Sequence, residues 1–155
     1  MIRIIIADDY AIVREGLKQI LAETKDMTVC DEACDGSELI EKVLRNKYDV
    51  AVSDFSMPGA NILDAITQIK RERPGIRILI LSMHPEEQYA ERVLKAGASG
   101  YLTKETAPAE LVKAIRKVSS GGKYISPNFV ETLPDSLISD HNNRTMPPFL
   151  TGRIG

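Results

Sequence analysis

The chain alternates short apolar runs with segments in which apolar residues recur every three to four positions. The apolar runs are rich in Ile, Val and Leu, which favours strands covered on both faces of a parallel sheet. Five such runs predict strands at residues 2–7, 28–33, 50–52, 77–81 and 99–102. The segments between and after them have a helical repeat, with buried stripes at Val13, Leu17, Ile20 and Leu21; Leu39, Ile40, Val43 and Leu44; Ile62, Leu63, Ile66 and Ile69; Tyr89, Val93 and Leu94; and Leu111, Ile115 and Val118.

Residues with known preferences for helix ends mark several of the boundaries. Asp35 precedes one helix, with a Glu three positions later, and Asn61 is a good N-cap for the next. A helix that starts at about Pro85 is expected to end at Gly97, because glycine readily adopts the left-handed conformation found there. Pro108 lies in the first turn of the last helix, where its missing N–H group is not needed.

Five strands that alternate with five helices predict an α/β protein, built on a five-stranded parallel sheet with right-handed crossovers. At this length a doubly wound (βα)5 arrangement of the flavodoxin-like kind is expected. The strand at 28–33 is the least hydrophobic and is expected near the sheet edge. Proline recurs from Pro127 onward, so residues 1–126 are interpreted as one domain and 127–155 as a linker or tail, with a short helix at about 129–133.

Composition narrows the class of protein. Hydrophobic residues make up 43% of the 155 positions and charged residues 27%, which is typical of a soluble globular protein. The net charge of −2 offers no electrostatic basis for nucleic-acid or anionic-membrane binding by the whole chain. The apolar runs are too short to span a bilayer, and Asp8 and Asp9 interrupt the first run before a signal peptide could form. A cytoplasmic protein is expected.

The two cysteines, Cys30 and Cys34, are interpreted as structural residues. Four positions along a strand separate Cα atoms by about 13 Å, whereas a disulfide needs less than about 7 Å. No histidine or second cysteine pair accompanies them, so they do not form a zinc site either.

Polar residues follow four of the predicted strands. Asp8 and Asp9 come after the first, Asp54 after the third, Ser82 after the fourth and Lys104 after the fifth. Because the carboxyl ends of parallel strands meet at one edge of a sheet, these side chains are expected to share a crevice. Carboxylates that converge there repel one another unless a cation lies between them, and Mg²⁺ prefers such oxygen ligands.

Each of these residues also has a structural interpretation. Asp8 and Asp9 could cap the first helix, Ser82 could be a turn hydroxyl and Lys104 a solvated surface residue. The conjunction of all of them at one edge favours phosphoryl chemistry. A carboxylate such as Asp54 can attack phosphorus and form an aspartyl phosphate, and the charge on the phosphoryl oxygens then calls for a metal, a lysine and a hydroxyl donor.

The same residues carry a family resemblance. The motifs are Ile-Ile-Ala-Asp-Asp at 5–9, Ser-Asp-Phe-Ser-Met-Pro-Gly at 53–59, Leu-Ser-Met at 81–83 and Ala-Gly-Ala-Ser-Gly-Tyr-Leu-Thr-Lys at 96–104. With them, the chain from Met1 to about Pro127 resembles the receiver domain of bacterial two-component response regulators. The particular residues in these motifs resemble those of the subfamily with a LuxR-type helix-turn-helix output domain.

The resemblance implies a role for each matching residue. Asp54 would accept a phosphoryl group from a sensor histidine kinase. Asp8 and Asp9 would hold Mg²⁺, Asp9 more directly, together with Asp54 and the backbone carbonyl of Ser56. Lys104 would pair with a phosphoryl oxygen.

The resemblance also implies a switch. Ser82 would hydrogen-bond the phosphoryl group, and Tyr101 would turn inward as Ser82 shifts, altering the surface of the fourth helix and fifth strand. Ser56 and His84 would tune how fast the aspartyl phosphate hydrolyses. Apart from this self-phosphorylation and slow self-dephosphorylation, no enzymatic turnover is expected.

Two positions depart from the family pattern. Ile62 stands where receivers of this kind usually have Gly, so the helix after the acceptor is expected to start earlier. The motif at 150–153, which in the family leads into the output domain, is followed here by two residues only. DNA contact is therefore expected only through an output domain that this chain lacks, and a homodimer through the receiver surface is compatible with the resemblance.

Three other functions remain as alternatives. A phosphatase of the haloacid dehalogenase type would need its nucleophile after the first strand and another Asp two residues later, whereas Asp8 and Asp9 are adjacent. A flavin-binding module would need a hydroxyl-rich and glycine-rich phosphate loop at that point. A stand-alone or pseudo-receiver interaction module would keep the fold without phosphorylation.

Overall fold

The computed structural model describes residues 1–83 and 87–125, without the side chains of residues 87 and 88. The expected tail at 127–155 with its helix at 129–133, the helix start at Pro85 and His84 lie outside these described residues. Eleven elements follow one another: β1 (Ile2–Ala7), α1 (Ala11–Ala22), β2 (Met27–Ala33), α2 (Gly36–Arg45), β3 (Val50–Asp54), α3 (Ile62–Glu72), β4 (Arg77–Ser82), α4 (Glu87–Ala96), β5 (Gly100–Thr103), α5 (Ala107–Ser119) and β6 (Tyr124–Ile125).

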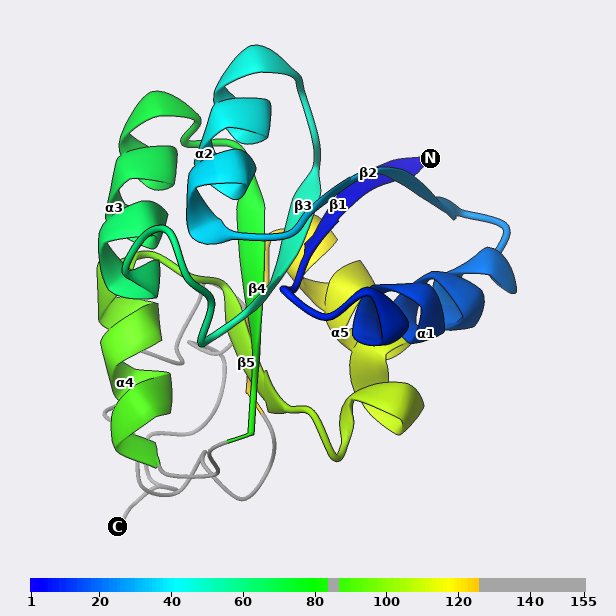
Figure 1. Cartoon of the computed structure of the whole chain (residues 1–155). Helices are drawn as coiled ribbons and strands as arrows, with labels where there is room; N and C mark the ends of the chain where they lie inside the picture. The colour runs from blue at the N-terminus through cyan, green and yellow to red at the C-terminus, as the bar shows by residue number, and fades with distance from the viewer. Residues whose placement is uncertain (84–86, 126–155) are drawn as a thin grey trace, which may run out of the picture.

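The strands form one parallel sheet in the order β2-β1-β3-β4-β5-β6. Helices α2, α3 and α4 cover one face, and α1 and α5 cover the other (Figure 1). The predicted doubly wound arrangement is therefore confirmed, and β2 lies at the sheet edge as its composition indicated. The expected number of five strands is wrong by one, because β6 adds a sixth strand of two residues, too short to produce a periodic pattern.

Two apolar layers enclose the sheet, and the alternation of side chains along each strand divides the residues between them. In β1, Ile5 packs in the layer under α2, α3 and α4, while Ile4 and Ile6 pack in the layer under α1 and α5. Both faces of β3 are buried along its whole length. The central strand is therefore held rigidly, and Asp54 stands at its end.

The helix ends follow the local signals. The Asp35 carboxylate accepts a 2.7 Å hydrogen bond from the backbone N–H of Glu38, and the Asn61 side chain accepts one of 2.8 Å from Leu63. Gly97 has φ of +124°, the left-handed conformation expected after α4. These contacts fix where α2 and α3 begin, and with them the loops at the carboxyl edge of the sheet.

The sixth strand depends on a glycine in its neighbour. A Cβ atom at Gly100 would lie 2.7 Å from the carbonyl oxygen of Tyr124, so β6 can approach β5 closely only where no side chain intervenes. The Tyr124 hydroxyl donates a 2.7 Å hydrogen bond to Glu110 on α5. These contacts hold β6 against both β5 and α5.

Two further expectations concern the cysteines and the length of the helices. Cys30 and Cys34 are exposed and form no disulfide. None of the helices in the described part of the chain combines the length and the apolar character that a membrane crossing needs.

Candidate functional site

Four adjacent strands bring the predicted site residues to one edge. Asp8 follows β1, Asp54 ends β3, Ser82 ends β4 and Lys104 follows β5. The register pairs Ser82 with Thr103, and the N–H of Lys104 donates to the Ser82 carbonyl at 2.8 Å. The structure therefore gathers residues that are up to 96 positions apart in the sequence.

Three carboxylates form the centre of the site. Ligand atoms from Asp8, Asp9 and Asp54 lie within 4.8 Å of one another. Asp8 and Asp54 are buried, with 1% and 5% of their surface exposed, whereas Asp9 is exposed. The Lys104 ammonium contacts two of the carboxylates, at 3.0 Å from Asp8 Oδ2 and 3.2 Å from Asp54 Oδ1. The cluster thus has the oxygen donors that a hard divalent cation prefers and one resident cation that partly offsets their repulsion.

Burial and mutual repulsion set the electrostatics of this cluster. The pKa of Asp54 is raised, first by burial and then by the charge of Asp8, and Lys104 and the Ser56 N–H oppose the rise. Burial lowers the pKa of Lys104, but its hydrogen bond to Asp8 and the charge of Asp54 outweigh this effect and leave the pKa raised. Lys104 is therefore firmly protonated, and an ionised Asp54 is stabilised by any additional positive charge.

The interpretation of Asp8 and Asp9 as a helix cap is not supported. The N-cap of α1 is Tyr10, which makes no side-chain capping bond. Asp8 Oδ1 instead accepts a 2.9 Å hydrogen bond from the Tyr10 N–H, before the helix begins. This bond fixes the Asp8 carboxylate in the loop, and the exposed Asp9 carboxylate has an oxygen within 4.8 Å of ligand atoms of Asp8 and Asp54.

The loop after Asp54 is docked on the start of α2. Gly36 donates a 2.9 Å hydrogen bond to the Pro58 carbonyl, and the Ser37 hydroxyl donates to the Gly59 carbonyl at 3.2 Å. Gly59 has φ of +98°, so it needs the freedom of a glycine. The loop that carries Ser56 is thereby held against a neighbouring helix.

Ile62, which stands where the family pattern has a glycine, is the first residue of α3 and directly follows the N-cap Asn61. No residue other than glycine has positive φ among those that the structure describes. The isoleucine side chain is buried, with 8% of its surface exposed. The departure from the family pattern is therefore accommodated by the helix and by the core.

Ser82 and Tyr101 occupy adjacent strands next to the cluster. Ser82 lines an open pocket of about 300 Å³ together with Met83, Thr103, Lys104 and Glu105. The Tyr101 side chain is fully buried and pairs in register with Ile80. Tyr101 already has the inward position that the sequence resemblance associates with the switched state.

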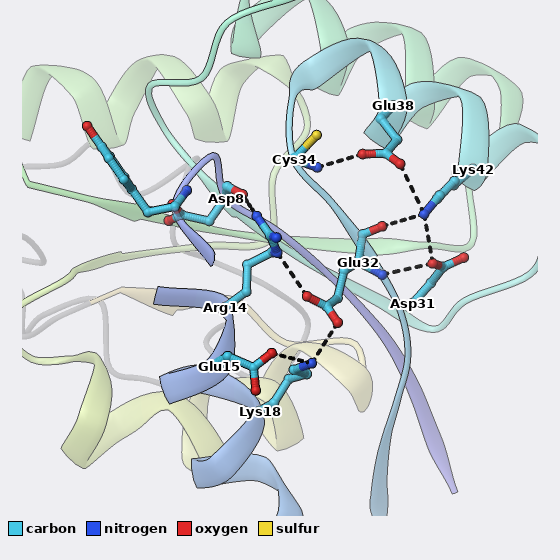
Figure 2. A network of polar contacts seen from close by, with 10 residues as sticks. Asp8, Arg14, Glu15, Lys18, Asp31, Glu32, Cys34, Glu38 and Lys42 are labelled. Atoms are coloured by element: carbon cyan, nitrogen blue, oxygen red, sulfur yellow. Dashed lines mark hydrogen bonds and ion pairs between the residues drawn. The ribbon is translucent and has the colours of Figure 1, made fainter. Parts of the chain in front are cut away.

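One contact at the site was missed at the level of sequence. Figure 2 shows Arg14 of α1 between Asp8 and Glu32 of β2. Its guanidinium donates to the Asp8 carbonyl at 2.7 Å and to Glu32 at 2.8 Å. The only signal in the sequence would have been the position of Arg14. It lies one turn into the helix that follows two acidic residues at a strand end.

Comparison with known families now identifies the class of protein. Residues 4–116 match the family described as response regulator receiver domain. The chain belongs to this family, and phosphorylation-dependent switching is the general function of such domains.

Curated relatives place the chain more narrowly. It is 39% identical over 151 residues to the oxygen regulatory protein NreC of Staphylococcus carnosus, which covers 95% of this chain and 70% of that protein. It is 37% identical over 149 residues to the response regulator UvrY of Escherichia coli, with 96% of this chain and 67% of that protein covered. The chain therefore spans about two thirds of the length of these relatives.

Solved structures agree with the fold and the family. A two-component response regulator of the LuxR family from an Aurantimonas species matches with a TM-score of 0.80 and 34% identity, over 88% of this chain and 98% of that one. The isolated receiver domain of RcsB from Salmonella enterica, in the presence of a phosphomimetic, matches with a TM-score of 0.78 and 29% identity, over 86% and 99% of the two chains. These likenesses support a LuxR-type receiver rather than the phosphatase or the flavin module.

Proposed function

We propose that this chain is a phosphorylation switch in which Asp54 accepts a phosphoryl group from a sensor histidine kinase. The observation that carries the proposal is the placement of Asp54, buried at the end of the central strand with Lys104 3.2 Å away and two more carboxylates beside it. The proposal also includes that the chain catalyses this transfer to itself and turns over no metabolite. The cytoplasmic location expected from the sequence stays a prediction.

The transfer is a substitution at phosphorus. An oxygen of the Asp54 carboxylate attacks the phosphorus atom of the phosphohistidine. The phosphorus–nitrogen bond breaks, and its electron pair stays on the imidazole of the kinase. Lys104 is positioned to pair with a phosphoryl oxygen, because its ammonium already lies beside Asp54 and it is firmly protonated.

Mg²⁺ fits the residues present. Asp8, Asp9 and Asp54 would hold it, with the Ser56 carbonyl as a further oxygen ligand, and their donor set is the one that hard cations prefer. When bound, the ion would neutralise negative charge on the carboxylates and on the incoming phosphoryl group. Asp9→Asn removes one charge from the cluster without removing a helix cap, so it is expected to weaken Mg²⁺ binding and leave the metal-free thermal midpoint unchanged.

The switch would run through Ser82 and Tyr101. The buried Ser82 lines a pocket together with Lys104, and its hydroxyl would hydrogen-bond a phosphoryl oxygen on Asp54. Tyr101 lies one strand away under the surface formed by α4 and β5. In a full-length regulator this surface would control a transcriptional output. Among the relatives, one RcsB structure is described as two dimers bound to two parallel DNAs.

Intact mass measurement tests the proposal directly. The purified chain is treated with a small phosphodonor such as acetyl phosphate and with Mg²⁺, and one phosphoryl mass should be added. Asp54→Ala should abolish the addition, while Asp64→Ala, a carboxylate in the first turn of α3, should not. Labelling of the Asp54 variant at the parent level would refute the assignment.

A further inference from the structure

Arg14 links the acidic loop to the edge of the sheet. Its guanidinium nitrogens contact two groups, the Asp8 carbonyl at 2.7 Å and the Glu32 carboxylate at 2.8 Å (Figure 2). Only 18% of the Arg14 side chain is exposed. A planar guanidinium that bonds two fixed acceptors has little freedom to move, so the contact restrains both of them.

The carbonyl that Arg14 contacts belongs to the peptide between Asp8 and Asp9. The other polar groups of Asp8 are also bonded: its N–H donates to Ala33, and its carboxylate accepts from Tyr10 and Lys104. Arg14 therefore supplies the bond that sets the plane of this peptide. The same peptide carries the N–H of Asp9, so its plane fixes the point from which the Asp9 backbone and side chain continue.

Glu32 is itself braced on both sides. Its second carboxylate oxygen accepts a 2.7 Å hydrogen bond from Lys18, and its backbone carbonyl accepts one from Lys42 of α2. The bond to Lys18, followed by the bond to Arg14, lowers the pKa of Glu32, which therefore stays ionised. The pairing of β2 with β1 and the bond from Lys42 hold the Glu32 backbone without Lys18, so Glu32 keeps its position when Lys18 is replaced.

We propose that Arg14 is a positioning residue for the metal-binding carboxylates, acting through the Asp8–Asp9 peptide. The inference rests on the proposed function, in which these carboxylates hold Mg²⁺. The direction in which Mg²⁺ affinity changes when Arg14 is removed distinguishes positioning from charge. If only the charge of Arg14 mattered, its removal would strengthen Mg²⁺ binding, because one positive charge near the site would be gone. Loss of positioning weakens Mg²⁺ binding instead.

The test compares two substitutions on α1, one of an arginine and one of a lysine. Arg14→Gln removes the contact with Asp8, whereas Lys18→Gln removes an equal charge from the same network without touching Asp8. Mg²⁺ affinity is measured by NMR titration of the backbone amides. Arg14→Gln is expected to raise the Kd for Mg²⁺ about tenfold, the usual effect of losing an outer-shell partner. Lys18→Gln should change it by less than about twofold.

A second readout is independent of the metal. In the metal-free protein, the carbonyl carbon shift of Asp8 reports its hydrogen bond to Arg14, and it should move in Arg14→Gln but not in Lys18→Gln. If Arg14→Gln does not fold, Arg14→Lys keeps the charge but reaches one acceptor at a time, and its Mg²⁺ affinity should lie below that of the parent.

The outcomes separate the two proposals. Parent-like or tighter Mg²⁺ binding by Arg14→Gln, or equal weakening by Lys18→Gln, would overturn the positioning role. Failure of the parent chain to bind Mg²⁺ would instead refute the proposed function. In that case the Asp8 carbonyl shift still decides whether Arg14 orients the peptide.

Discussion

The ammonium of Lys104 donates a 3.0 Å hydrogen bond to the carboxylate of Asp8, a residue 96 positions earlier in the sequence. The same ammonium lies 3.2 Å from Asp54. In the protein without metal, Lys104 therefore offsets part of the repulsion between two buried carboxylates. A divalent cation would do the same, so Lys104 and Mg²⁺ are expected to compete for Asp8.

Lys104→Met should consequently bind Mg²⁺ more tightly than the parent, by about tenfold, or about 1.4 kcal/mol. Its phosphorylation should nevertheless be much slower, because no fixed cation remains to pair with the phosphoryl oxygens. Calorimetric Mg²⁺ titration and the rate of mass addition measure the two effects. Lys113→Met, at an exposed position of α5, is the control and should change neither. Weaker Mg²⁺ binding by Lys104→Met would contradict the competition.

The stability of the metal-free protein should depend on the charge of Asp54. Because burial and Asp8 raise its pKa above the ordinary value of 3.8, the folded state binds this proton more tightly than the unfolded chain does. The ionised carboxylate therefore destabilises the fold above the raised pKa, and the effect vanishes below about pH 4, where both states are protonated.

Asp54→Asn should then raise the thermal midpoint at about pH 7 by a few degrees. The gain should shrink as the pH falls toward about 4. Melting curves in a chelator across this range measure it. A less stable Asn variant at neutral pH would mean that the pairing with Lys104 outweighs burial.

The packing of the loop after Asp54 against α2 should be disturbed by a single added methyl group. A Cβ atom at Gly36 would lie 3.0 Å from both the Cβ and the carbonyl oxygen of Ala60, so Gly36→Ala must push the loop away. We expect a loss of about 1–3 kcal/mol in the free energy of unfolding, with slower phosphorylation at Asp54. Denaturant unfolding and mass addition report the two.

Gly16 is the matched control for this substitution. It lies inside α1, and a Cβ atom there would meet nothing within 4 Å. Gly16→Ala should therefore stabilise the protein by about 0.5–1 kcal/mol through the higher helix propensity of alanine. Similar effects of the two substitutions would show that the loop contact is not the cause.

Ser82→Ala separates acceptance of the phosphoryl group from the response to it. A bound group shifts an equilibrium only through contacts that differ between the states, and the Ser82 hydroxyl would be such a contact. The variant should still be labelled at Asp54 but show smaller phosphate-dependent NMR shifts at residues 87–103. Identical shift changes in parent and variant would exclude this route.

Local signals allowed much of the fold to be predicted. Asp35 and Asn61 act within one helical turn, so their capping roles can be read from the sequence alone. The convergence of Asp8, Asp54 and Lys104 could be predicted because parallel strands end at one edge.

The remaining features depend on contacts that sequence patterns do not encode. The bond from Arg14 to the Asp8 carbonyl depends on a side-chain conformation braced by Glu32. β6 is too short to leave a periodic pattern. The full burial of Tyr101 depends on packing between elements that are distant in the sequence, which a local pattern does not encode.

The two-residue strand β6 also protects the sheet. Without it, β5 would be an outer strand with unpaired N–H and C=O groups, to which a strand from another molecule could add. The other outer strand, β2, carries Asp31 and Glu32, and such charges discourage strand addition. On the β5 side the protection rests on Gly100, since a side chain there would collide with Tyr124. A two-residue edge strand offers little backbone for strand addition, so displacing β6 is expected to expose the longer edge of β5 and favour self-association.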